Sequence, residues 1–121
     1  MCGIFGVAAR EDSHIPQTLI KEAADRLFLL SESRGKEAAG VSILSGGNIA
    51  VYKQPAPASQ LIRTREYNRL FKGRGVGRGI PYVVMGHARL VTNGSLEMNE
   101  NNQPVVKNGL VGIHNGIIVN D

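Results

Sequence analysis

One cysteine near the start of the chain is the first candidate for chemistry. Cys2 becomes the first residue once Met1 is removed, and a small side chain after Met1 is the pattern that aminopeptidases process. A thiol needs a base to become a nucleophile. The α-amino group of a first-residue cysteine titrates at about pH 8 and can take that proton directly or through water. Position alone favours an ordinary thiol, because chain ends fray and single cysteines are commonly just small hydrophobic residues.

Two further polar sites, each at the end of an expected strand, shift that balance toward a nucleophile. Arg89 could hold a carboxylate in a bidentate pair, and Thr92 and Asn93 could add hydrogen bonds. The pair Asn115-Gly116 offers an amide side chain and a backbone N–H, which are the donors of an oxyanion hole. Each feature alone is more commonly an exposed arginine or a plain turn, so their combination is what favours catalysis.

The composition limits the classes of protein to which the chain can belong. The chain has 121 residues, 42% of them hydrophobic and 20% charged, which predicts one globular domain or part of one. A single cysteine excludes a disulfide within the chain. No apolar run approaches the roughly 20 residues that cross a bilayer, and no secretory signal is visible. We therefore expect a cytoplasmic protein without membrane contact.

The net charge of +4 is concentrated between Arg63 and Arg78, where six basic residues accompany one acid, Glu66. A nucleic-acid patch is one interpretation. A solvated helix face followed by a loop is favoured, because Tyr67 and Phe71 do not form the aromatic pattern that stacks on bases.

The elements that must position these residues alternate between strands and helices. Apolar runs bounded by turn residues predict strands, and a Gly46-Gly47 turn predicts a hairpin. Apolar residues at helical spacing predict two helices. The expected strands are a first strand 3–9, buried on both faces, the hairpin strands 41–45 and 48–53, and strands 81–89 and 110–114; the expected helices cover about 16–32 and 58–71. The pattern is α+β.

Four motifs in register make the chain resemble the class II glutamine amidotransferases, which are N-terminal nucleophile hydrolases. The motifs are Cys2-Gly-Ile-Phe-Gly6, Ser33-Arg-Gly-Lys-Glu-Ala-Ala-Gly40, Gly86-His-Ala-Arg-Leu-Val-Thr-Asn-Gly94 and His114-Asn-Gly-Ile-Ile-Val-Asn120. Among members of the family, glutaminase domains like that of glucosamine-6-phosphate synthase are the most similar. The resemblance implies a four-layer α/β/β/α sandwich, of which residues 2–121 would form the N-terminal portion.

The resemblance also implies a catalytic group. Cys2 would attack the glutamine side-chain amide and form a thioester, with its own α-amine as the base. The Asn115 side chain and the Gly116 N–H would stabilise the oxyanion. No metal or organic cofactor is implied. The ammonia would pass to a synthase or sugar-isomerase domain, in the same chain or a separate one. Whether the protein forms homo-oligomers is left open.

Further residues would bind glutamine or frame the site. Arg89 would bind the α-carboxylate, helped by Thr92 and Asn93, and Arg34 would organise the site near the N-terminus. His87 is interpreted as a residue that frames the site. A metal site that joins Cys2 to His87 and His114 is a less favoured interpretation.

The chain departs from the family pattern in several places. Leu90 stands where Trp is usual, Asn93 where His is usual, and Lys36-Glu37 where an aromatic-Asp or Pro-Asp pair is common. The acid that binds the glutamine α-amino group lies downstream of the last motif in the family, and Asp121 is too close to that motif for the role. We therefore expect the C-terminal part of the domain to be missing from this sequence.

Two other functions remain open from the sequence. The chain could hydrolyse another linear amide through Cys2, in which case a cation at Arg89 would be dispensable. It could also be a non-catalytic scaffold that binds RNA or a partner through the basic segment from Arg63 to Arg78.

Overall fold

A computed structural model describes residues 1–72, 81–91 and 102–116. The elements are β1 (Gly3–Ala9), α1 (Gln17–Ser31), the 3-10 turn η1 (Glu32–Arg34), β2 (Ala38–Ser45), β3 (Asn48–Gln54), α2 (Ala58–Leu61), α3 (Arg65–Leu70), β4 (Tyr82–Arg89), β5 (Val105–Lys107) and β6 (Leu110–Gly112). The expected α+β class is confirmed.

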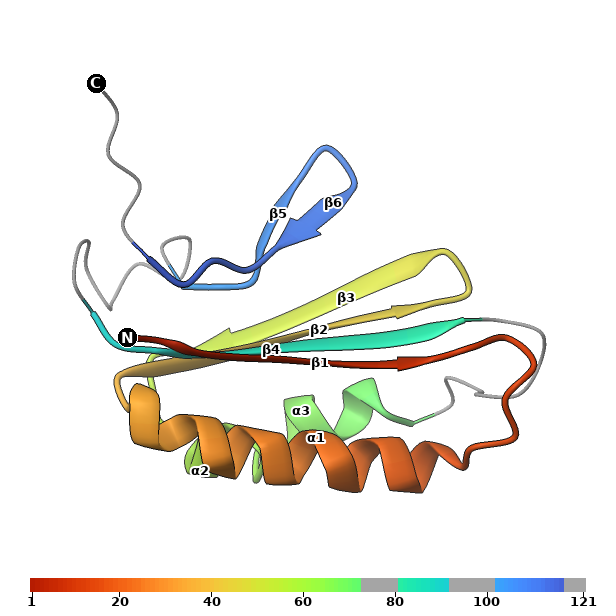
Figure 1. Cartoon of the computed structure of the whole chain (residues 1–121), viewed down its shortest axis with the longest axis horizontal. Helices are drawn as coiled ribbons and strands as arrows, with labels where there is room; N and C mark the ends of the chain where they lie inside the picture. Colours follow the sequence, from red (N-terminus) through yellow and green to blue (C-terminus); the bar gives the residue numbers. More distant parts are fainter. Residues whose placement is uncertain (73–80, 92–101, 117–121) are drawn as a thin grey trace.

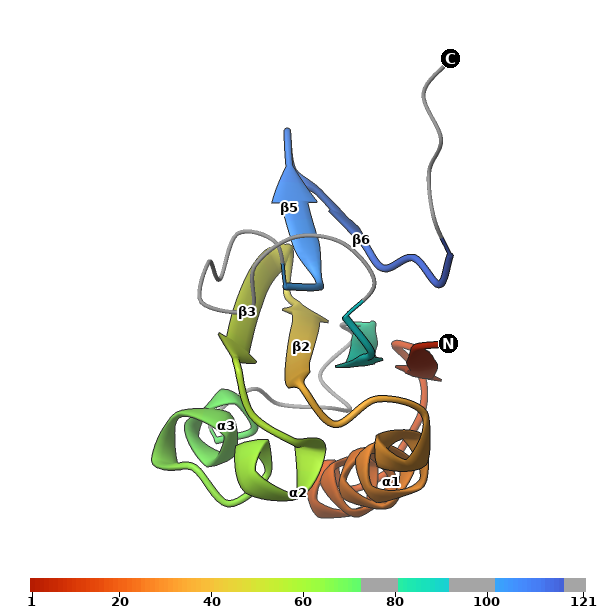
Figure 2. The ribbon, with the colours of Figure 1, turned by 90° about the vertical axis from the view of Figure 1, so that its left-hand side faces the viewer.

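The main sheet has four antiparallel strands in the order β1-β4-β2-β3. Helices α1, α2 and α3 all lie against one face of this sheet, and the β5–β6 hairpin lies over the other face (Figures 1 and 2). The two faces therefore have different neighbours. The complete four-layer sandwich remains a prediction, because β5 and β6 form a separate sheet of only two strands within the described ranges.

The hydrophobic core lies between the sheet and the helices. Phe28 of α1 is fully buried and meets Phe5 and Tyr67 edge-to-face, with ring centroids 4.7 and 5.9 Å apart. Burial raises the pKa of Tyr67, and its hydroxyl donates to Asp25 Oδ1 at 2.7 Å, which raises it further. A buried hydroxyl without such an acceptor would be destabilising, so this polar pair lets a tyrosine fill the core.

The first strand is present as expected, but its predicted burial on both faces is wrong. β1 is an edge strand of the main sheet, and its residues alternate in exposure. Ile4 is 48% exposed on the face opposite the helices. A short run without polar residues does not distinguish an edge strand from a central one.

Helix α1 confirms the expected first helix almost to the residue. Its buried residues are Ile20, Ala24 and Phe28, which follow one another at i, i+4 spacing. Leu19 and Leu30, which also fit the apolar periodicity, are 53% and 73% exposed. The buried stripe is therefore narrower than the apolar stripe in the sequence.

The expected second helix, about 58–71, is two short helices instead of one. Helix α2 ends at Leu61, and Thr64 then has extended backbone angles and caps α3 by accepting a hydrogen bond from the Tyr67 N–H. A threonine with this geometry begins a new helix. Of the four apolar positions expected to be buried here, Leu61 and Phe71 are buried, whereas Ile62 and Leu70 are only partly buried against the core.

Two hairpins turn through residues with positive φ. The expected one has Gly46 and Gly47 at φ 60° and 76°, which suits a two-residue turn. The other joins β5 and β6 through Asn108 and Gly109, at φ 52° and 76°. The strand expected over 110–114 is present as β6, but β5 was not expected, although Asn-Gly between apolar residues is a strong hairpin signal.

Of the helices in the described ranges, none is both long enough and apolar enough to span a membrane.

Candidate active site

The thiol of Cys2 lies beside the end of β4. In the pairing of β1 with β4, Gly3 lies opposite Ala88, so one further step along both strands places Cys2 next to Arg89. The backbone N–H of Leu90 donates to Cys2 Sγ at 3.4 Å, and Sγ lies 3.6 Å from the Leu90 carbonyl oxygen. Since both contacts use the backbone of Leu90, they do not require the tryptophan that is usual at this position.

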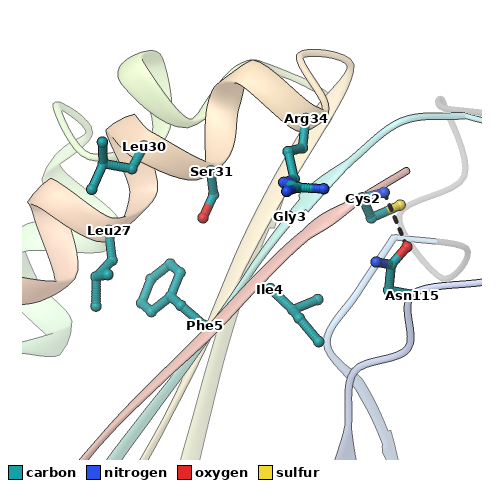
Figure 3. A pocket seen from close by; sticks show the side chains of 9 residues that line it. All are labelled: Cys2, Gly3, Ile4, Phe5, Leu27, Leu30, Ser31, Arg34 and Asn115. Atoms are coloured by element: carbon teal, nitrogen blue, oxygen red, sulfur yellow. Dashed lines mark hydrogen bonds between the residues drawn. The ribbon is translucent and has the colours of Figure 1, made fainter.

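The backbone nitrogen of Cys2 faces the Asn-Gly motif. It donates to Asn115 Oδ1 at 3.1 Å, across 113 residues of sequence (Figure 3). In the structure this nitrogen is a peptide N–H, since Met1 is still attached, and after processing the same atom is the α-amine. Because the carboxamide oxygen faces this donor, the Nδ2 group of Asn115 is directed elsewhere and can act as a donor. Met1 itself is 75% exposed, as access by an aminopeptidase requires.

The residue after Asn115 has a backbone conformation that favours glycine. Gly116 has a φ of 149°, and a Cβ at this position would approach the His114 ring to 3.0 Å. A side chain here would therefore be strained and crowded. The motif keeps its backbone N–H next to the Asn115 amide without a side chain in the way.

A pocket of about 380 Å³ opens beside Cys2, along the outer edge of β1 (Figure 3). Its walls come from the start of β1, the C-terminal part of α1, Arg34 and Asn115. Figure 3 shows the Arg34 side chain directed toward the start of β1. The structure thus brings three of the expected site residues, Cys2, Asn115 and Arg34, to one cavity.

Arg89 is close in register to Cys2, but it does not line that pocket. Its side chain is only 7% exposed, and Nη1 donates to Asn102 Oδ1 at 2.6 Å. Its carbonyl accepts from the Glu37 N–H at 3.2 Å, and a Cβ on Gly35 would lie 2.3 Å from the Arg89 carbonyl carbon. The end of β4 is therefore held tightly by the 35–37 loop.

His87 lies two residues before Arg89 and is fully buried. Within the described part of the chain, neither ring nitrogen makes a well-formed hydrogen bond. Burial lowers the pKa of His87 to about 4 and the charge of Arg89 lowers it as well, while the backbone of His114 opposes both effects. The imidazole is neutral at pH 7, which suits a residue that frames the site.

Several expected features remain untested. Thr92 and Asn93 lie outside the described residues, as do Arg74 and Arg78 of the basic segment. The other cations of that segment, Arg63, Arg65, Arg69 and Lys72, are exposed. In the described ranges no group of three or more His, Cys, Asp or Glu residues could hold a metal ion.

Sequence reasoning missed the two residues that bond to the site from the 102–104 segment. Asn102 and Gln103 end the polar run 97–103, which lies between the expected strands 81–89 and 110–114. Their side chains reach Arg89 and the backbone of His114, respectively. The only signal available was a polar pair next to Pro104, which is too common to mark a site.

Curated relatives match the chain along nearly its whole length. It is 34% identical to the amidophosphoribosyltransferase of Methanocaldococcus jannaschii, over 99% of this chain and 23% of that protein. It is 32% identical to the amidophosphoribosyltransferase of Mycobacterium tuberculosis, over 98% of this chain and 20% of that protein. It is 30% identical to the glutamine–fructose-6-phosphate aminotransferase (isomerizing) of Xylella fastidiosa, over 99% of this chain and 17% of that protein.

The chain thus spans less than a quarter of the length of these relatives. No family model and no solved structure matches it. The relatives are of two kinds, amidophosphoribosyltransferases and a glutamine–fructose-6-phosphate aminotransferase, and the similar identities do not single out one of them. The chain is a homologue of the class II glutamine amidotransferases, and it matches their N-terminal glutaminase part.

Proposed function

We propose that this chain hydrolyses glutamine to glutamate and ammonia through a thioester on Cys2. The observation that carries the proposal is the 3.1 Å contact between the Cys2 nitrogen and Asn115 Oδ1. It joins the first residue of the processed chain to the motif that supplies the oxyanion donors. The nucleophile, its base and the stabilising amide therefore share one cavity.

The reaction is nucleophilic acyl transfer in two stages. The Cys2 thiol gives its proton to the α-amine, and the sulfur attacks the side-chain amide carbon of glutamine. The carbonyl oxygen becomes an oxyanion, to which Asn115 Nδ2 and the Gly116 N–H donate. The carbon–nitrogen bond then breaks, ammonia leaves with the proton from the α-ammonium group, and water hydrolyses the thioester to glutamate and free thiol.

Substrate selectivity depends on the cations around Cys2. A glutamine α-carboxylate needs a partner, and Arg89 supplies a guanidinium from the strand next to Cys2. Thr92 and Asn93, which follow it in the chain, would add hydrogen bonds to the substrate. Arg34 at the pocket wall would keep the start of β1 in place. Hydrolysis of a simple amide would not need this charge, so Arg89 favours glutamine over other linear amides.

The ammonia would pass to a synthase domain that aminates a sugar phosphate. The relatives' names support this, since one is an aminotransferase named for glutamine and fructose 6-phosphate and the other is named for a phosphoribosyl group. The partner domain would determine which of these acceptors receives the ammonia.

The direct test is intact mass after incubation of the intact protein with the diazoketone analogue of glutamine. We expect loss of Met1 and one adduct, mapped to Cys2 by peptide analysis. Cys2→Ser removes the adduct and abolishes glutamate release. Arg89→Ala slows labelling, because the analogue carries the same α-carboxylate.

A matched control for the charge is Arg65→Ala, which removes an exposed arginine from α3. It should label at the wild-type rate. A folded, Met1-free protein that neither forms the adduct nor releases glutamate would overturn the proposal. Glutamine turnover unaffected by Arg89→Ala would overturn the carboxylate assignment.

A further inference from the structure

We propose that Asn102 and Gln103 act as a positioning pair that fixes the two ends of the glutamine site relative to each other. Asn102 would orient Arg89, which binds the substrate carboxylate. Gln103 would hold the backbone that leads to Asn115, which stabilises the oxyanion. The inference rests on the proposed glutaminase function and assigns roles to two residues outside the motifs that indicated it.

The contact with Arg89 is short and buried. Asn102 is 1% exposed, and its Oδ1 accepts from Arg89 Nη1 at 2.6 Å. A guanidinium carries its N–H donors in a rigid planar fork, so a bond to one nitrogen fixes the direction in which the others point. A bond to a charged donor in a buried place is also stronger than one at the surface. Asn102 is therefore placed to set the plane in which Arg89 meets a carboxylate.

The next residue reaches the other end of the site. The Gln103 side-chain oxygen accepts a hydrogen bond from the backbone N–H of His114. His114 directly precedes Asn115, whose Oδ1 faces the Cys2 nitrogen. A shift of the His114 backbone would therefore move the amide of Asn115 relative to the thiol.

The backbone of the Asn102–Gln103 pair packs directly against the main sheet. A Cβ on Gly40 would lie 1.9 Å from the Gln103 carbonyl oxygen, so this part of β2 touches the segment backbone to backbone. Lys53 Nζ donates to the Asn102 carbonyl oxygen at 2.8 Å. Because the backbone is held from β2 and β3, the two side chains can transmit a fixed geometry from the rigid sheet to both ends of the site.

The two members of the pair should have separable effects. Arg89 acts on binding, because the α-carboxylate is present throughout the reaction. Asn115 acts mainly in the transition state, where the oxyanion forms. Loss of the Asn102 contact should therefore raise the KM for glutamine, and loss of the Gln103 contact should lower kcat.

The first experiment measures glutamine hydrolysis and Cys2 alkylation in the intact protein with Asn102→Leu. We expect KM to rise about tenfold to a hundredfold, because a contact to a charged group is lost and Arg89 is misplaced. Labelling by the diazoketone should slow by a similar factor. Iodoacetamide, which carries no carboxylate, should alkylate Cys2 at the wild-type rate, since this reaction does not use Arg89.

A second variant covers the case in which Asn102→Leu does not fold. Asn102→Ser keeps a polar side chain, but this side chain is too short for its oxygen to reach Arg89 Nη1. It should raise KM as Asn102→Leu does, because the contact is lost. A wild-type KM in either folded variant would overturn the role of Asn102.

The Gln103 arm is tested with a conservative pair. Gln103→Leu should lower kcat about tenfold or more with little change in KM, and Gln103→Glu, which keeps the accepting oxygen, should restore kcat. Equal kcat values in Gln103→Leu and Gln103→Glu would overturn the role proposed for Gln103.

The matched control is Asn68→Leu. Asn68 donates to the Ile62 and Thr64 carbonyl oxygens at 3.0 and 2.8 Å, on the helix side of the sheet. It should lower stability and leave KM and kcat unchanged. If the wild-type protein neither labels nor hydrolyses glutamine, the glutaminase function fails; if it does both and every Asn102 and Gln103 variant matches it, only the positioning proposal fails.

Discussion

The two faces of the main sheet are held by different kinds of interaction. On the helix side, apolar and aromatic side chains from the sheet and from α1, α2 and α3 pack into one core. On the opposite side, His87 and Arg89 emerge from β4 and meet residues 102–116. The first face is held by burial of apolar area, which is non-directional, and the second by single polar contacts, which require particular atoms in particular places.

This difference separates stability from function in one strand. Along β4, Tyr82 and Val84 belong to the hydrophobic core, while the alternate residues His87 and Arg89 lie on the opposite face of the sheet. Successive side chains of a strand point to opposite faces. Substitutions on the helix side should therefore change the free energy of unfolding, and those on the other side should change catalysis.

The largest expected effect is on the helix side, at Phe28. Phe28→Ala should lower the free energy of unfolding by about 3–5 kcal/mol, because it leaves a cavity between Phe5 and Tyr67. Denaturant titration measures this loss of stability, and the m-value should stay unchanged. Leu29→Ala is the control from the same helix, since Leu29 is 51% exposed. Equal losses for the two variants would contradict this assignment of the core.

On the site face, the largest expected effect is at Asn115. Asn115→Ala should lower kcat for glutamine hydrolysis about 100- to 1000-fold through loss of an oxyanion donor. Its side chain is exposed, so the free energy of unfolding should change little. Asn48→Ala, at the exposed first residue of β3, is the matched control and should leave kcat unchanged. A large loss of stability in Asn115→Ala without loss of kcat would reverse the comparison.

Much of the helix face could be predicted from the sequence, because its signals are local. Apolar spacing predicted α1, and the Gly46-Gly47 pair predicted the hairpin. The errors there have local causes as well. Periodicity alone did not show that Thr64 would cap a new helix, or that β1 would have an exposed face.

The site face was predicted only where residues belonged to motifs. Cys2 and Asn115 lie 113 residues apart, and nothing in their spacing shows that they meet. The contacts of Asn102 and Gln103 depend on atoms 13 and 11 residues away, in β4 and in the backbone before Asn115, which only the folded chain brings together. Polar contacts of this kind have no periodicity, so they are visible only once the fold is known.

The buried His87 on the site face should make the free energy of unfolding depend on pH. Burial lowers the pKa of His87 from 6.5 to about 4, so between these values the unfolded chain binds more protons than the folded one. Stability should therefore be full above about pH 6.5 and fall as the pH drops toward 4, by at most about 3 kcal/mol. Denaturant titrations across this range measure the slope.

The control for this slope is a histidine outside the sheet. His14→Gln removes an exposed histidine and should leave the pH dependence unchanged, whereas His87→Gln should reduce it. A wild-type slope in His87→Gln would show that other groups cause the loss of stability at low pH.

The smallest expected effect returns to the helix side, at the break between α2 and α3. Thr64 Oγ1 accepts from the Tyr67 N–H at 3.2 Å, and Thr64→Ala should lower the free energy of unfolding by about 1 kcal/mol through loss of this cap. Thr64→Ser keeps the accepting oxygen and should retain most of that stability, as thermal unfolding of the pair would show. If Thr64→Ala were as stable as Thr64→Ser, the cap would not be what separates the two helices. Since this contact lies among the helices, kcat and KM for glutamine should be the same in both variants.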